Sequence, residues 1–275
     1  MKPFLPSINT HSTPYFRGFW STDRIAVLLV VSLFLPFAVS LADRGYSLGV
    51  AFIVSLAVIT GWQLLFSLLR RQKPGLDGVA TALIFTILAA DALPVWQLAL
   101  AATFGIVVGE LVFGGRGFSI VNPSVVALAF LTFSFTGVVY AQPSPWIGLA
   151  ALPAGILLIA FRLISWRMVV AVIAGLAVFG VAQGQPIDPA LLNGQFIFLL
   201  VFLACDPASS ASTNLGRWAN GLTVGGLAWV FTPVGGIPTG PEAMVPAILL
   251  ASIFAPLFDR IVILFNSYSR RRPNV

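Results

Sequence analysis

Two stretches of the sequence, LDGVATALIFTILAAD at residues 76–91 and LNGQFIFLLVFLACD at residues 192–206, look like one short apolar segment written twice. Each places roughly a dozen apolar residues between a small polar turn and an Asp, which is too few to cross a hydrocarbon core of about 30 Å comfortably as a full helix. They occupy matching places in two halves of the chain. Paired short segments of this kind are typical of a site at the midplane of a membrane protein.

The composition indicates a polytopic helical membrane protein. Hydrophobic residues make up 58% of the chain and charged residues 9%, and long apolar runs recur from Ile25 to Phe265. A soluble fold would have almost no charge left for a surface in water, so we exclude that class. We expect an all-α fold of ten hydrophobic segments, with centres near Leu33, Val58, Ile84, Thr103, Leu131, Ala154, Leu176, Leu199, Leu227 and Ile253.

The loop charges predict the orientation. If the N-terminus is cytoplasmic, Arg44 is the one basic residue on the outer side of the ten-segment arrangement, and the loops on the inner side carry the rest. This split follows the positive-inside rule and places both termini in the cytoplasm. The basic residues are dispersed among short loops and form no stripe with interleaved aromatics, so we expect contacts with lipid headgroups and no nucleic-acid partner.

The order of the segments predicts an inverted repeat. Five spans run from inside to outside and the next five begin outside, so equivalent halves have opposite orientation, and the short segments come third in each half. We therefore divide the chain into a cytoplasmic tail (1–22), two five-helix repeats (23–141 and 142–268) and a basic tail (269–275). Met1 to Thr22 has no apolar centre, and so we expect no signal peptide there.

Two loops on the predicted cytoplasmic side are rich in small and polar residues: FGGRGFSIVNP at 113–123 and CDPASSASTNLGR at 205–217. Gly114, Gly115 and Gly117 permit tight backbone and a close approach to a planar ligand. Pro123 is expected to open the next helix at its first turn. The bland alternative for the second loop is a serine-rich cap for helix ends.

Three acidic residues are placed where charge is costly. Asp206 lies at the edge of the apolar phase and needs a partner such as Arg217 or Arg116. Its counterpart Asp91 closes the other short segment, and Glu110 lies within an apolar span. Asp91 and Glu110 are weak candidates for an ion pathway, and for Glu110 the alternative is a side chain that reaches the interface.

The same two loops, with APLFDRIVI at 255–263, resemble the family of the B subunit of the sodium-pumping NADH:quinone oxidoreductase (NqrB) and the D subunit of the Rnf complex (RnfD). The resemblance covers nearly the whole chain from about Ser21 to Ile263. It implies a ten-helix subunit of the bacterial inner membrane that holds flavin and takes part in electron transfer coupled to ion movement. It also implies partners: other membrane subunits of an Rnf/Nqr-like complex, quinone, and a flavinylated extracytoplasmic protein.

By this resemblance, the motif positions that line a non-covalent riboflavin or FMN site are Gly114, Gly115, Gly117, Ser119, Asn122, Asp206, Thr213 and Asn214. The chain departs from the family in one place. Members usually carry a Thr with covalent FMN in the outer loop after the fifth span, whereas residues 141–146 read AQPSPW here. We therefore expect a shortened member without covalent FMN.

Three functions remain open. The first is a subunit of an ion-translocating oxidoreductase that passes electrons through bound flavin, and whether it acts as an enzyme is undecided. The second is a solute channel or transporter of related inverted-repeat fold. The third is a membrane anchor for a flavinylated extracytoplasmic partner. Bound flavin distinguishes the first from the other two.

Overall fold

The protein is a bundle of α-helices in the computed structural model, which describes residues 22–71, 75–89, 93–115, 118–141, 144, 146–184, 193–232 and 236–270. Within these residues the chain forms ten α-helices, and every predicted segment centre lies in a helix or its π-helical continuation. The helices are α1 (Thr22–Arg44), α2 (Tyr46–Arg70), α3 (Asp77–Leu88), α4 (Val95–Ile106), α5 (Pro123–Ser134), α6 (Trp146–Ala160), α7 (Trp166–Ala182), α8 (Gly194–Leu199), α9 (Asn214–Val230) and α10 (Pro241–Arg270). The predicted all-α class is confirmed.

Two helices continue into π-helical turns. α4 is extended by η1 (Val107–Leu111) and α8 by η3 (Leu200–Ala204). In each, a backbone N–H bonds the carbonyl five residues earlier, Val112 N to Val107 O at 2.9 Å and Cys205 N to Leu200 O at 3.1 Å. π-turns inside helices are rare and frequently lie at functional sites.

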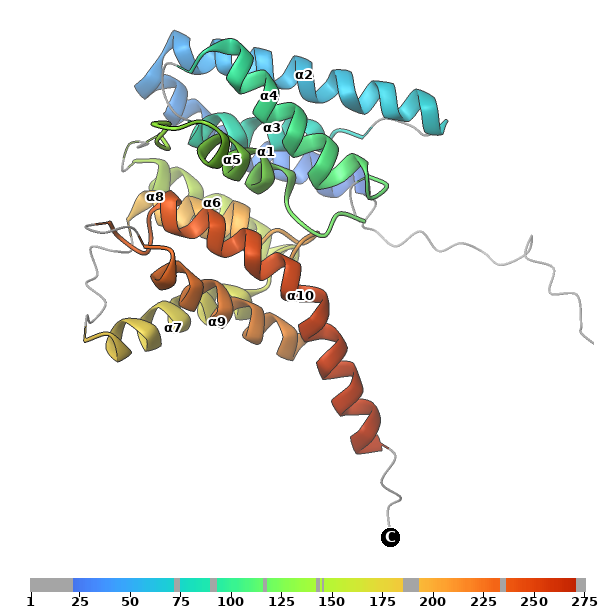
Figure 1. Ribbon diagram of the computed structural model, residues 1–275, viewed down its shortest axis with the longest axis vertical. Helices are drawn as coiled ribbons and strands as arrows, with labels where there is room; N and C mark the ends of the chain where they lie inside the picture. The colour runs from blue at the N-terminus through green and yellow to red at the C-terminus, as the bar shows by residue number, and fades with distance from the viewer. Residues whose placement is uncertain are drawn as a thin grey trace, which may run out of the picture.

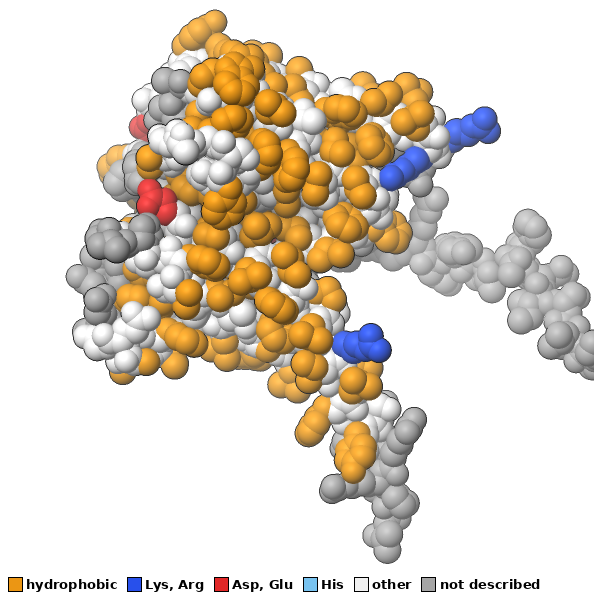
Figure 2. Space-filling model, in the orientation of Figure 1, with side chains coloured by type: hydrophobic (Ala, Val, Ile, Leu, Met, Phe, Trp, Pro, Cys, Tyr) orange, Lys and Arg blue, Asp and Glu red, His pale blue; other side chains and the backbone are white. Residues whose placement is uncertain are grey.

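The lengths and composition of the helices fit a membrane protein. Three helices are long and apolar enough to cross a bilayer, over Arg24–Arg44, Tyr46–Arg70 and Pro241–Tyr268. Most of the others are shorter apolar helices. Apolar side chains cover the face of the molecule seen in Figure 2, where the visible Arg side chains lie at one end of the bundle and the visible Asp and Glu side chains at the other. The chain is a membrane protein with several apolar helices.

The two short segments form the centre of the bundle. All residues of α3 except Val79 are buried, and so is every residue of η3. With 12 residues, α3 is only about 18 Å long. The prediction that both segments are too short for a full span is confirmed.

The packing partners follow a regular scheme (Figure 1). α1 packs on α3 as α6 packs on α8, α2 on α4 as α7 on α9, and α4 on α5 as α9 on α10. Between the two halves, α1 contacts α6 and α5 contacts α10. Each of these pairs has its counterpart when α1–α5 are matched in order with α6–α10.

Candidate functional site

Both polar loops lie at the end of the bundle where the even-numbered helices end (Figure 1). The first loop, residues 112–122, follows η1 and leads into α5; the second, residues 205–213, follows η3 and leads into α9. Each π-turn is therefore followed by a polar loop, and each loop ends at the N-terminus of a helix. Backbone N–H groups at such a terminus favour anionic or carbonyl ligands.

Glycine shapes the first loop. Gly114 and Gly115 adopt backbone φ angles of 122° and 102°, which residues with a Cβ rarely adopt. The N–H of Gly115 donates to the Glu110 carbonyl at 3.1 Å, which closes the helix end. A Cβ at Gly115 would meet nothing within 4 Å, so the backbone borders open space there. Gly117, the third predicted glycine, lies outside the described residues.

Asn122 ends the first loop as the N-cap of α5. Its Oδ1 accepts a hydrogen bond from the Ser124 N–H at 2.9 Å, and Pro123 takes the first helical position, as predicted. Asn122 and Ser119 are 4% and 6% exposed. The structure thus gives Asn122 a local role in helix capping and leaves both side chains inside the protein.

Asp206 opens the second loop in a buried position. The side chain is 4% exposed, and its Oδ2 accepts a hydrogen bond from the Ser209 hydroxyl at 3.1 Å. The neighbouring Cys205 is buried as well.

Thr213 ends the second loop as the N-cap of α9, and Asp259 of α10 holds it. The Thr213 hydroxyl accepts from the Gly216 N–H at 3.1 Å and donates to Asp259 Oδ1 at 2.6 Å. The Thr213 N–H donates to the same oxygen at 2.9 Å, while the N–H and hydroxyl of Ser212 both donate to Asp259 Oδ2 at 2.8 Å. One carboxylate thus takes four hydrogen bonds from two consecutive residues.

Asn214 and Arg217 tie the beginning of α9 to its surroundings. Asn214 Oδ1 accepts from Arg167 Nη1 at 2.9 Å, and Arg167 belongs to the first turn of α7. Arg217 Nε donates to the Ala211 carbonyl at 3.1 Å. The second loop is therefore braced by α7 and α10 as well as by its own side chains.

Of the two ion-pathway candidates, the structure describes only Glu110. Glu110 lies on η1 and is 2% exposed, directly before the first loop. Asp91 lies outside the described residues. The structure thus places a buried carboxylate close to each π-turn: Glu110 lies within η1, and Asp206 lies two residues after the end of η3.

Sequence reasoning missed three polar contacts that hold the bundle together. Asp259 lies inside the APLFDRIVI motif and was assigned no role, although an acid within an apolar span is itself a signal. Gln63 Nε2 donates to Asp77 Oδ2 at 3.2 Å, with both residues buried. Arg44, which the charge pattern uses only as an orientation marker, donates to the carbonyls of Thr86, Ile87 and Ala89 at the end of α3. A cation at a helix C-terminus also balances the helix dipole.

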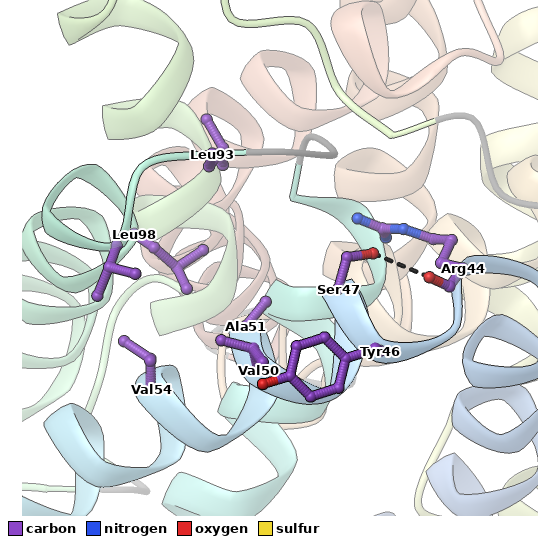
Figure 3. Close-up of a pocket in the computed structure, with 9 residues that line it drawn as sticks. Arg44, Tyr46, Ser47, Val50, Ala51, Val54, Leu93 and Leu98 are labelled. Carbon is purple, nitrogen blue, oxygen red and sulfur yellow. Dashed lines mark hydrogen bonds between the residues drawn. The ribbon is translucent and has the colours of Figure 1, made fainter.

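Two cavities lie at the end of the bundle opposite the polar loops. The larger, about 290 Å³, lies between the beginnings of α2 and α4 (Figure 3). Its rim carries Arg44, Tyr46 and Ser47, and its wall is aliphatic. The smaller, about 200 Å³, lies between the end of α5 and the beginning of α10. No predicted flavin residue lines either cavity.

Comparison with known proteins identifies the chain's relatives. The family model described as the NQR2, RnfD, RnfE family matches residues 9–148 and 137–266. The B subunit of the Na(+)-translocating NADH-quinone reductase of Stutzerimonas stutzeri is 28% identical over 269 residues, 78% of this chain and 66% of the relative. The corresponding protein of Haemophilus influenzae is 29% identical over 280 residues, 80% of this chain and 67% of the relative. The chain thus spans about two thirds of the length of these relatives.

Proposed function

Because the chain belongs to the NQR2, RnfD, RnfE family, we propose that it is a membrane subunit of an Nqr/Rnf-type complex that passes electrons through a non-covalent flavin held between the two polar loops. The observation that carries the proposal is the placement of both loops at one end of the bundle, each after a π-turn. Flavin supplies one- and two-electron chemistry when bound, and the protein supplies binding and electrostatics.

The residues of the first loop fit a planar, polar-edged ligand. The left-handed backbone at Gly114 and Gly115 turns the chain, and Gly115 borders open space, so a ring can approach there without a Cβ in the way. Ser119 and Asn122 supply a hydroxyl and an amide from the same loop. We assign them to the polar edge of the ring.

The second loop closes the same site. Asp206 and Ser209 form a buried pair at its beginning, and Thr213 and Asn214 stand at the N-terminus of α9. Asp259 holds Thr213, and Arg167 holds Asn214. We therefore assign to Thr213 and Asn214 the task of fixing the loop against which the flavin rests. Loss of this frame would leave the ligand's polar groups without ordered partners.

The packing scheme supports the inverted repeat. Matching α1–α5 with α6–α10 reproduces the pairs α1–α3, α2–α4 and α4–α5, although the packing of α2 on α3 has only a small counterpart between α7 and η3. The matching makes α3 and α8 equivalent, which agrees with the duplicated sequence segments. We therefore keep the division into halves at 23–141 and 142–268. The two π-turns then fall in non-equivalent helices, the fourth of one half and the third of the other, so the site itself is not duplicated.

We further propose that the loop end of the bundle faces the cytoplasm and that both termini lie there. The support is the charge asymmetry of the sequence, together with the gathering of the visible Arg side chains at one end in Figure 2. Ser144→Cys and Arg71→Cys, each in a Cys205→Ser background, report on the two ends. An impermeant thiol reagent applied to intact cells should label position 144 and spare position 71, and the reverse pattern excludes this orientation.

The absorbance spectrum of the purified protein tests the proposed function. We expect a flavin spectrum that dithionite bleaches, and release of the flavin on denaturation, since residues 141–146 contain no Thr for a phosphoester bond. A denatured band that keeps its flavin fluorescence would contradict the non-covalent attachment. A folded protein with no chromophore would contradict the redox role and favour the transporter or anchor instead.

A further inference from the structure

The last part of α10 leaves the bundle. Ala255, 3% exposed, is the last buried residue of the helix, and every described side chain from Pro256 to Tyr268 is exposed or only partly buried. The helix turns aside in this region in Figure 1 and projects away from the other helices of the bundle. A proline within the helix, Pro256, accounts for the turn because it removes a backbone hydrogen bond and clashes with the preceding turn. We name residues 257–268 the α10 tail.

The α10 tail is amphipathic. At 100° per residue, its large apolar side chains share roughly half of the helix circumference. They are Leu257, Phe258, Ile261, Val262, Leu264, Phe265 and Tyr268. Asp259, Arg260, Asn266 and Ser267 occupy the opposite half, where Ile263 is the one apolar side chain among the described residues.

The apolar half is open. Leu264 is 61% exposed, Phe265 69% and Tyr268 68%. Large apolar side chains gathered on one helix face and left in water mark a surface that something else covers. A coiled-coil partner would select a narrow seam of two positions in seven, whereas this face is about twice as broad and ends in an aromatic residue.

The charges identify what covers it. Arg260 lies on the polar half, and Arg270, Arg271 and Arg272 follow directly in the sequence. The only acid of the α10 tail, Asp259, is occupied by Ser212 and Thr213. A broad apolar face beside a polar face with arginines is the pattern of a helix that lies in the plane of a membrane surface.

We propose that the α10 tail lies flat in the interface of the leaflet at the loop end of the bundle, with its apolar half in the acyl chains and Arg260 on anionic lipid headgroups, next to the arginines that follow in the sequence at 270–272. Basic residues next to a membrane contribute about a fivefold preference each for an anionic surface. Asp259 lies in the first turn of the α10 tail and also holds Thr213. The same residue therefore connects the segment at the lipid surface to the second polar loop.

Spin labels on the full-length protein test the proposal. Single cysteines replace Ile261, Leu264 and Tyr268 on the apolar half, and Arg260 and Ser267 on the polar half, in a Cys205→Ser background. In vesicles that contain anionic phospholipid, we expect oxygen to reach the first three labels and a water-soluble nickel chelate to reach the last two. The contrast should weaken in purely zwitterionic vesicles and in an Arg270→Gln, Arg271→Gln, Arg272→Gln variant.

Two results would overturn the proposal. Equal access of the nickel chelate to both halves in anionic vesicles would place the α10 tail in water, as a surface for a protein partner. Equal shielding of both halves would place it within the hydrocarbon core as part of a span. Thermal unfolding of each variant provides the control for folding, and because these side chains lie outside the buried core, the unfolding temperature should stay within a few degrees of the parent protein.

Discussion

The two polar loops stand at the same end of the bundle and each follows a π-turn, yet they are held by different means. The first, residues 112–122, depends on backbone conformation: two glycines at positive φ and a local cap by Asn122. The second, residues 205–213, depends on side chains from elsewhere, above all Asp259. One loop is thus fixed by its own sequence and the other by the tertiary structure, and substitutions should affect them through different residues.

The largest effect is expected from Asp259→Ala. This change leaves four donors of Ser212 and Thr213 without their acceptor, although water replaces part of the loss at the exposed Ser212. We expect a local cost of about 2–3 kcal/mol, or roughly a 30-fold to 150-fold loss of amide exchange protection at residues 212–216. Hydrogen exchange measured by mass spectrometry reports it.

The control for this prediction is Asp43→Ala, which removes an exposed acid at the other end of the bundle. The first loop should keep its protection in both variants. Equal loss in both loops, or none in the second, would contradict the division between local and tertiary support.

A smaller effect is expected from Gly114→Ala. The residue adopts φ of 122°, so a Cβ is strained at this position whatever space surrounds it, at a cost of about 1–3 kcal/mol. Gly61→Ala is the matched control, because Gly61 lies within α2 and a Cβ there would meet nothing within 4 Å. Thermal unfolding in detergent should show a lower midpoint for Gly114→Ala and an unchanged or higher one for Gly61→Ala; a neutral Gly114→Ala would show that the first loop does not need its left-handed turn.

The smallest effect is expected at the two caps. Asn122→Ser keeps an N-cap oxygen and should change stability by only a few tenths of a kcal/mol, whereas Asn122→Ala should cost about 1 kcal/mol. Thr213→Ser should be similarly mild because the hydroxyl that serves Gly216 and Asp259 remains. Chemical or thermal unfolding measures all three variants, and an Asn122→Ser as damaging as Asn122→Ala would mean that the amide nitrogen also supports the fold.

The amino-acid sequence predicts the helices well and the contacts between them poorly. Long apolar runs require helices in a membrane, so all ten segment centres were right. The π-turns at 107–111 and 200–204 were missed because an apolar run has the same pattern in an α-helix and in a π-helix. The shortness of several other helices, such as α5 with 12 residues, was missed because apolar loop residues continue the hydrophobic pattern.

The candidate site was predictable only where the chemistry is local. Pro123 after Asn122 indicates a helix start from sequence alone. The role of Asp259 depends on a contact with Thr213 at a separation of 46 residues, and that of Arg44 on a contact with Thr86 of α3 at a separation of 42 residues. No local pattern encodes such distances, although an acid in an apolar span and a lone outer arginine both indicate that a partner must exist.

The central claim, that one flavin is held jointly by the two loops, is tested most directly by the flavin-to-protein ratio of purified variants. Asn122→Ser keeps the α5 cap and removes the amide. Asn214→Leu changes the side chain that follows the second loop, and Arg167→Gln is the control for the hydrogen bond between Arg167 and Asn214. We expect Asn122→Ser and Asn214→Leu to weaken flavin binding roughly tenfold to hundredfold while the proteins remain folded. Asn266→Leu on the α10 tail should keep full occupancy, and full occupancy in both loop variants would contradict the claim.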